Sequence, residues 1–85
     1  MSDIVIYSKS WCPYCQKAKA LLVSKGVTFE EIDVGNDPEG QAAMAKRANG
    51  RSSVPQIFIK GTHVGGCDDL HALEDAGKLD ALIAG

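Results

Sequence analysis

The chain has 85 residues, of which 45% are hydrophobic, and it carries a formal net charge of −2. A chain of this size can bury one core by packing alone, and its three cysteines do not supply an even disulfide framework. No segment approaches the roughly 20 consecutive apolar residues of a membrane span, the first residues lack the basic flank of a secretory signal, and no basic excess marks a face for nucleic acid. We therefore expect a single cytoplasmic domain over residues 1–85, with neither a membrane nor a nucleic acid as partner.

Strands and helices are predicted to alternate along the first half of the chain. An apolar run that starts at Ile4 indicates a buried strand, and the helix after it is opened by Pro13 and ended by Gly26. A second strand and helix follow, with Asp37-Pro38-Glu39 opening the helix. The predicted elements are a strand over residues 4–7, a helix over 13–24, a strand over 28–33 and a helix from 37 toward 49–50.

The second half predicts a hairpin and then helices. Two short apolar runs flank Lys60-Gly61, which is typical of a tight hairpin turn. Asp68 or Asp69 is expected to cap a third helix that runs to Ala76. The predicted elements are strands over residues 56–59 and 62–64, a helix to residue 76 and a short last helix over 79–84. The order β-α-β-α-β-β-α predicts an α/β fold with a four-stranded mixed sheet flanked by helices.

The segment Cys12-Pro13-Tyr14-Cys15 predicts redox chemistry. Two thiols at this spacing can switch between a dithiol and a disulfide, and in a reducing compartment such a pair is more often catalytic or metal-binding than a static crosslink. Cys12 is expected at the start of the first helix, where free backbone amides and the helix dipole favour a thiolate, with Cys15 one turn inside. Cysteines at helix N-termini have pKa values lowered from about 8.5 to roughly 3.5–7.5. We expect Cys12 to be the nucleophile and Cys15 the resolving thiol.

Two further motifs, Ser53-Val54-Pro55 and Gly65-Gly66-Cys67-Asp68-Asp69, follow in that order. Together with the cysteine motif, over nearly the whole chain, they resemble the bacterial dithiol glutaredoxins. The resemblance implies a thioredoxin-like fold, a single glutaredoxin domain, and reduction of disulfide-bonded or glutathionylated proteins. Glutathione would be the electron-donating cosubstrate, restored by glutathione reductase with NADPH, with no tightly bound cofactor or metal and with the protein as a monomer.

The same resemblance implies a glutathione site. In the family pattern the backbone of Val54, before a cis proline opposite the active cysteine, binds the cysteinyl part of glutathione. The N-terminus of the third helix can hold the γ-glutamyl carboxylate, with the Asp68 side chain on the ammonium, while Lys9 and Arg51 can bind the glycine carboxylate. The implied glutathione-binding residues are Lys9, Tyr14, Arg51, Ser53, Val54, Pro55, Gly66, Cys67 and Asp68.

Other interpretations remain open from the residues. A tryptophan immediately before the first cysteine, here Trp11, is typical of thioredoxins. Its ring is expected either to pack at the rim of the active site or to contact the substrate. A thioredoxin-type disulfide reductase is therefore one alternative. A [2Fe-2S] cluster carrier built on Cys12 is another, although Pro13 argues against it, and a zinc site would need Cys67 or the two histidines as further ligands. Lys9 and Arg51 are otherwise solvated surface charges, Asp68 a helix cap, and Cys67 a small hydrophobic residue.

Overall fold

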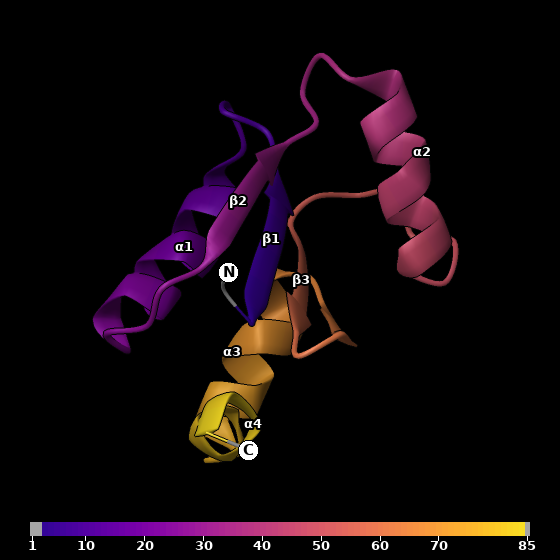
Figure 1. The fold of residues 1–85 in the computed structure, drawn as a ribbon. Helices are drawn as coiled ribbons and strands as arrows, with labels where there is room; N and C mark the ends of the chain where they lie inside the picture. The colour runs from indigo at the N-terminus through magenta and orange to yellow at the C-terminus, as the bar shows by residue number, and fades with distance from the viewer. Residues whose placement is uncertain (1–2, 85) are drawn as a thin grey trace.

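The structure is a computed structural model that describes residues 3–84; the ends of the expected domain, residues 1–2 and 85, lie outside the described part. Strands and helices follow one another along the chain as Figure 1 shows. Their bounds are β1 Ile4–Ser8, α1 Pro13–Ser24, β2 Glu30–Asp33, α2 Pro38–Arg47, β3 Gln56–Ile59, β4 Thr62–Gly65, α3 Cys67–Asp75 and α4 Leu79–Ala84. Within residues 3–84, no helix has the length and apolar character needed to cross a membrane.

The strands form one mixed sheet in the order β2-β1-β3-β4. β1 pairs in parallel with β2 and antiparallel with β3, and β3 pairs antiparallel with β4. Lys60 and Gly61 join β3 to β4 with φ values of 52° and 80°, as the two central residues of a tight hairpin turn require. The predicted fold class and the predicted hairpin are both confirmed.

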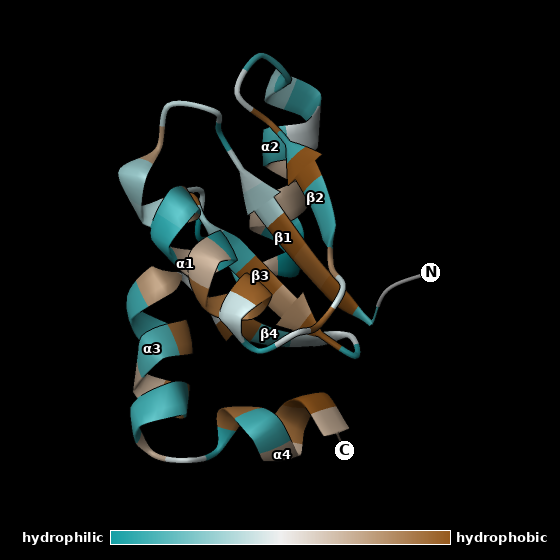
Figure 2. Ribbon diagram, turned by 90° about the vertical axis from the view of Figure 1, so that its left-hand side faces the viewer, coloured by the Kyte–Doolittle hydropathy of each residue, from teal (hydrophilic) through white to brown (hydrophobic). Residues whose placement is uncertain are grey.

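Helices cover both faces of this sheet because its two central strands are apolar on both sides. Side chains alternate along a strand, so Ile4 and Ile6 point to one face of β1 and Tyr7 to the other. Figure 2 draws much of β1 in brown, the colour of hydrophobic residues. The core residues shared with α1, α3 and α4 are Ile4, Ile6, Ala18, Leu22, Ile57, Ile59, Cys67, Leu70 and Leu79. The core residues shared with α2 are Tyr7, Val34, Met44, Ala48 and Phe58.

The structure differs from the sequence prediction at several element boundaries. β1 ends at Ser8 and β4 at Gly65, one residue later than predicted, while α2 ends at Arg47 and α3 at Asp75, earlier than predicted. β2 begins at Glu30 rather than at residue 28, because its register with β1 starts where Glu30 meets Val5. The prediction that Asp68 or Asp69 caps the third helix is wrong, since the N-cap is Gly66. Asp69 instead sits in the first turn and accepts a hydrogen bond from the Gly66 amide, which is one half of a capping box.

Candidate active site

Cys12 lies where the chain leaves β1 and enters α1. It is the N-cap of α1, with Pro13 as the first helical residue, and its own amide donates to the carbonyl of Lys9. Its sulfur accepts a hydrogen bond from the Cys15 amide, with 3.2 Å between nitrogen and sulfur. The reactive atom of the predicted nucleophile is thus held against the positive end of a helix.

Cys15 has a different environment, although it lies one turn away. Its side chain is fully buried, as expected, whereas Cys12 is half-buried. Burial, followed by the hydrogen bond with Cys12, raises the pKa of the Cys15 thiol to about 12, while the Lys9 backbone amide acts in the opposite direction. Cys15 is therefore a thiol throughout the physiological pH range, which suits a resolving rather than an attacking residue.

The backbone before β3 faces the Cys12 sulfur. Val54-Pro55 is a cis peptide bond, and the Cys12 thiol donates weakly to the Val54 carbonyl across 3.8 Å. Pro55 is buried, while Ser53 is exposed and Val54 half-buried. The segment that leads into β3 thus runs past the sulfur, with Val54 within reach of a substrate.

A cleft of about 150 Å³ lies beside this segment. Its walls are Tyr14, Arg51, Ser53, Val54, Pro55, Gly66, Cys67, Asp68 and Asp69. Every residue of the expected glutathione set except Lys9 is therefore brought to one place, although these residues come from three separate parts of the chain. Lys9 is half-buried beside Cys12 and does not line this cleft.

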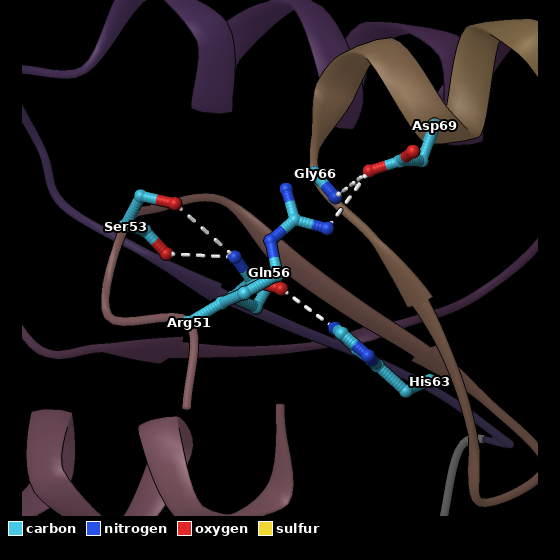
Figure 3. A network of polar contacts seen from close by, with 6 residues as sticks. All are labelled: Arg51, Ser53, Gln56, His63, Gly66 and Asp69. Carbon is cyan, nitrogen blue, oxygen red and sulfur yellow. Dashed lines mark hydrogen bonds and ion pairs between the residues drawn. The ribbon is translucent and has the colours of Figure 1, made fainter. Parts of the chain in front are cut away.

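Asp69 is a site residue that the sequence analysis assigned only as a cap. One carboxylate oxygen accepts from the Gly66 amide at 2.9 Å and from an Arg51 guanidinium nitrogen at 3.0 Å, as Figure 3 shows. The Gly66 hydrogen bond, and then that of Arg51, lower the pKa of the Asp69 carboxyl. Arg51 is thereby turned across the cleft while about half of its side chain stays exposed. The acidic residue three positions after a glycine, in the pattern of a capping box, is the signal that could have revealed the contact between Asp69 and Gly66.

The N-terminus of α3 forms the far wall of the cleft. A Cβ at Gly66 would lie 3.4 Å from both Arg51 Nη2 and the Pro55 carbonyl oxygen, so a larger residue would crowd this wall. Cys67 follows and is buried, with a thiol pKa that burial and then Asp68 raise. Asp68 is exposed at the mouth of the cleft. The wall therefore combines free helix-terminal amides with one outward carboxylate.

Trp11 packs on the loop that follows β2. A Cβ built on Gly35 would lie 2.9 Å from Cη2 of the indole, so the ring rests on this loop. The Gly35 amide donates to Asp33 Oδ1, which holds that loop in place. The indole nevertheless stays 63% exposed, and the Tyr14 side chain is 59% exposed. Two exposed aromatic residues therefore stand within two positions of Cys12 in the sequence.

The cysteines are all free thiols, and none of them belongs to a cluster of metal ligands. Within residues 3–84, no group of three or more His, Cys, Asp or Glu side chains lies close enough together to hold an ion. A zinc site made from Cys12 and Cys15 would thus lack its remaining ligands in the described part of the chain.

Comparisons with known proteins agree with this geometry. The chain is 60% identical to a glutaredoxin of Pseudomonas aeruginosa over 84 residues, covering 99% of both chains. It is 52% identical to glutaredoxin 3 of Escherichia coli over 83 residues, covering 98% of this chain and 99% of that one.

Solved structures of glutaredoxins are also similar to this chain. The crystal structure of a buckwheat glutaredoxin–glutathione complex has a TM-score of 0.89 at 32% identity, covering 98% of this chain and 77% of that one. The solution structure of glutaredoxin from Brucella melitensis has a TM-score of 0.84 at 58% identity, covering 98% and 89%. The glutaredoxin family model matches residues 4–64. The chain belongs to the glutaredoxin family of glutathione-linked thiol oxidoreductases.

Proposed function

We propose that the protein reduces protein–glutathione mixed disulfides and protein disulfides with electrons from glutathione. The observation that carries this proposal is the placement of the Cys12 sulfur, which accepts from the Cys15 amide and lies 3.8 Å from the carbonyl of Val54, a residue that lines the cleft. An oxidised thiol bound along Val54 would bring its sulfur to Cys12. Cys12 and Cys15 are the proposed catalytic residues.

The mixed-disulfide reaction needs one cysteine. The Cys12 thiolate attacks the glutathione sulfur, the bond to the substrate protein breaks, and the substrate leaves as a thiolate that takes a proton from water. A second glutathione thiolate then attacks the glutathione sulfur on Cys12. Glutathione disulfide leaves and Cys12 is a thiolate again, so one free glutathione has been consumed for each mixed disulfide that is reduced.

A protein disulfide needs both cysteines. Cys12 first forms a disulfide with one substrate sulfur and releases the other as a thiol. Cys15 then loses its proton and attacks Cys12, which frees the second substrate thiol and closes the Cys12–Cys15 disulfide. Two glutathiones reduce this disulfide again. The buried Cys15 thiol with its raised pKa reacts only once Cys12 beside it is oxidised.

The proposed binding mode divides glutathione between three groups. The Val54 backbone takes the cysteinyl part, with Ser53, Pro55 and Tyr14 beside it. The amides of Cys67 and Asp68 and the exposed Asp68 carboxylate take the γ-glutamyl end, where carboxylate and ammonium meet opposite partners. The positive charges of Arg51 and Lys9 take the glycine carboxylate. The glutathione complex of the buckwheat relative supports glutathione as the ligand, because that protein is similar over 98% of this chain.

The wider setting is part of the same proposal. Glutathione reductase and NADPH restore glutathione, glutathione is a cosubstrate and no cofactor is tightly bound. The protein acts as a monomer in the cytoplasm on disulfide-bonded or glutathionylated proteins. It forms a single glutaredoxin domain.

A coupled assay tests the proposal. A small glutathione mixed disulfide is supplied with glutathione, glutathione reductase and NADPH, and NADPH oxidation is followed. Cys15→Ser is expected to keep this activity and to lose reduction of a protein disulfide, whereas Cys12→Ser loses both. Wild-type protein without turnover, or a Cys15→Ser variant that cannot use the mixed disulfide, would contradict the proposed roles.

A further inference from the structure

A chain of polar side chains runs from the edge of the sheet to the cleft, and it takes no part in the proposed thiol–disulfide exchange steps. Figure 3 shows its members, which are His63 of β4, Gln56 at the start of β3 and Ser53 before the cis proline. His63 Nε2 lies 2.7 Å from Gln56 Oε1. Gln56 Nε2 lies 3.0 Å from the Ser53 carbonyl oxygen and 3.3 Å from its hydroxyl. We call these three residues the relay.

The middle of the relay is an amide inside the protein. Gln56 is fully buried, and a buried amide without hydrogen bonds destabilises the fold. Its NH2 group faces Ser53 and its oxygen faces His63, so both ends are occupied. A polar side chain kept at such a position constrains the groups that it bonds.

The hydrogen-bond pattern assigns the donor on His63. The Ser53 carbonyl only accepts, so the Gln56 nitrogen must point to it and the Gln56 oxygen must point to the imidazole. His63 therefore carries a proton on Nε2. Its ring also lies on Phe58, with 5.0 Å between the ring centroids, which fixes its plane.

The other end of the relay meets the reaction site. Ser53 directly precedes Val54, whose carbonyl lies 3.8 Å from the Cys12 sulfur, and both residues line the cleft. Ser53 itself is exposed and outside any strand, so its backbone has no sheet partner to hold it. Within the relay, Gln56 supplies that restraint.

We propose that His63 is a positioning residue for thiol–disulfide exchange, acting through Gln56 to hold the Ser53–Val54 backbone in the orientation that receives the substrate. The expected change in kcat/KM rests on the proposed function, in which the substrate is a glutathione mixed disulfide. Loss of the Nε2–H donor leaves the Gln56 oxygen unpaired. The amide then turns away from Ser53, and the backbone beside Cys12 becomes mobile.

Kinetics of four variants test the relay. His63→Leu is expected to lower kcat/KM for the mixed disulfide about tenfold, with kcat at saturating mixed disulfide within twofold of wild type. His63→Gln, whose amide NH2 can occupy the place of Nε2–H, is expected to restore kcat/KM to within threefold. In a Gln56→Leu background, His63→Leu is expected to cause no further loss, because the two residues act as one unit.

The matched control is the other histidine, His71 on α3. Its Nε2 is buried and has no hydrogen-bond partner among the described residues. His71→Leu is expected to keep kcat/KM within twofold. Equal losses in His63→Leu and His63→Gln, equal losses in His63→Leu and His71→Leu, or no loss in His63→Leu would each overturn the proposal.

A measurement on the unaltered protein separates this inference from the proposed function. Long-range nitrogen–proton NMR of the histidine rings is expected to show a proton on Nε2 of His63 that exchanges slowly with solvent. An Nε2 without a proton at neutral pH would overturn the relay, whatever the activity. Wild-type protein without turnover, together with a protonated Nε2, would overturn the proposed function and the kinetic role of His63, and would leave the hydrogen-bond assignment standing.

Discussion

The Cys15 backbone amide donates to the Cys12 sulfur across 3.2 Å, so the two cysteines of the motif are joined by a helix cap. This contact makes them unequal. Cys12 is half-buried at the helix end, while Cys15 lies inside the core with its pKa raised to about 12. The thiols therefore differ in accessibility, and burial keeps the Cys15 thiol protonated.

Alkylation of the native reduced protein should reveal this difference. At pH 8 a thiol with a pKa of about 12 is only about 0.01% thiolate, so iodoacetamide is expected to modify Cys12 and to spare Cys15. Cys67 is also expected to be spared, because it is buried and its pKa is raised. Peptide mass spectrometry after a short pulse measures the three sites separately. Cys12→Ser, the control, should take up label only after unfolding, and early label on Cys15 would be the contrary result.

Substitution of Asp69 should affect both stability and substrate binding. Asp69→Ala removes the acceptor of the Gly66 amide and is expected to lower the free energy of unfolding by about 1 kcal/mol, a typical loss for a helix cap. Asp69→Asn keeps an oxygen acceptor and is expected to cost less. Both variants remove the negative charge that pairs with Arg51 and holds its guanidinium in the cleft. Because Arg51 is proposed to bind glutathione, we expect a severalfold higher KM for the mixed disulfide.

The free energy of unfolding at acid pH tests the role of Asp69 in a second way. The folded-state pKa of Asp69 lies below its usual value of 3.8, so its contribution is complete above that pH and is lost as pH falls through the lower value. The stability gap between wild type and Asp69→Asn is therefore expected to shrink below about pH 3.8 in urea titrations. A gap that stays constant to pH 2 would argue against the ion pair.

The contact between Trp11 and Gly35 can be followed by fluorescence, because Trp11 is the only tryptophan. A methyl group at Gly35 would enter the space of the indole, so Gly35→Ala is expected to push the ring outward. The emission maximum should move to longer wavelength, and the stability loss should stay below about 1 kcal/mol since the ring is already exposed. Asn36→Ala in the same loop is the control. Unchanged emission in Gly35→Ala would show that the ring does not rest there.

Truncation of two neighbouring residues of α1 should lower the free energy of unfolding by very different amounts. Leu22 is fully buried in the core shared with α3 and α4, so Leu22→Ala is expected to cost about 2–5 kcal/mol of unfolding free energy. Val23 is 65% exposed, and Val23→Ala is expected to stay within about 0.5 kcal/mol of wild type. Chemical denaturation measures both, and similar losses would contradict the orientation of the helix.

Sequence patterns predicted the architecture because each element carries its own local signal. Pro13 and Pro38 mark helix starts, and Lys60-Gly61 marks the hairpin. The N-terminus of α3 was misplaced because three acceptable capping residues, Gly66, Asp68 and Asp69, stand close together. Which of them caps depends on how β4 delivers the chain to the helix, and that is a tertiary property.

The candidate site was predictable as a set of residues but not as a set of contacts. The resemblance named the cleft residues, yet the pairing of Arg51 with Asp69 joins positions 18 apart and has no local pattern. The same is true of Trp11 resting on Gly35. His63 was an unassigned strand residue, because only the register of β3 with β4 brings its ring to Gln56.

The cap at the start of α1 has a thermodynamic consequence. In the proposed reaction the capping atom is also the reacting atom, so oxidation of Cys12 weakens an acceptor that the reduced fold uses. The free energies of unfolding of the two redox forms and the reduction potential are then linked variables. A substitution that favours the reduced fold by 1.4 kcal/mol more than the oxidised fold raises the potential by about 30 mV. Evolution or design can therefore tune the oxidising strength of this chain through α1, without touching either sulfur.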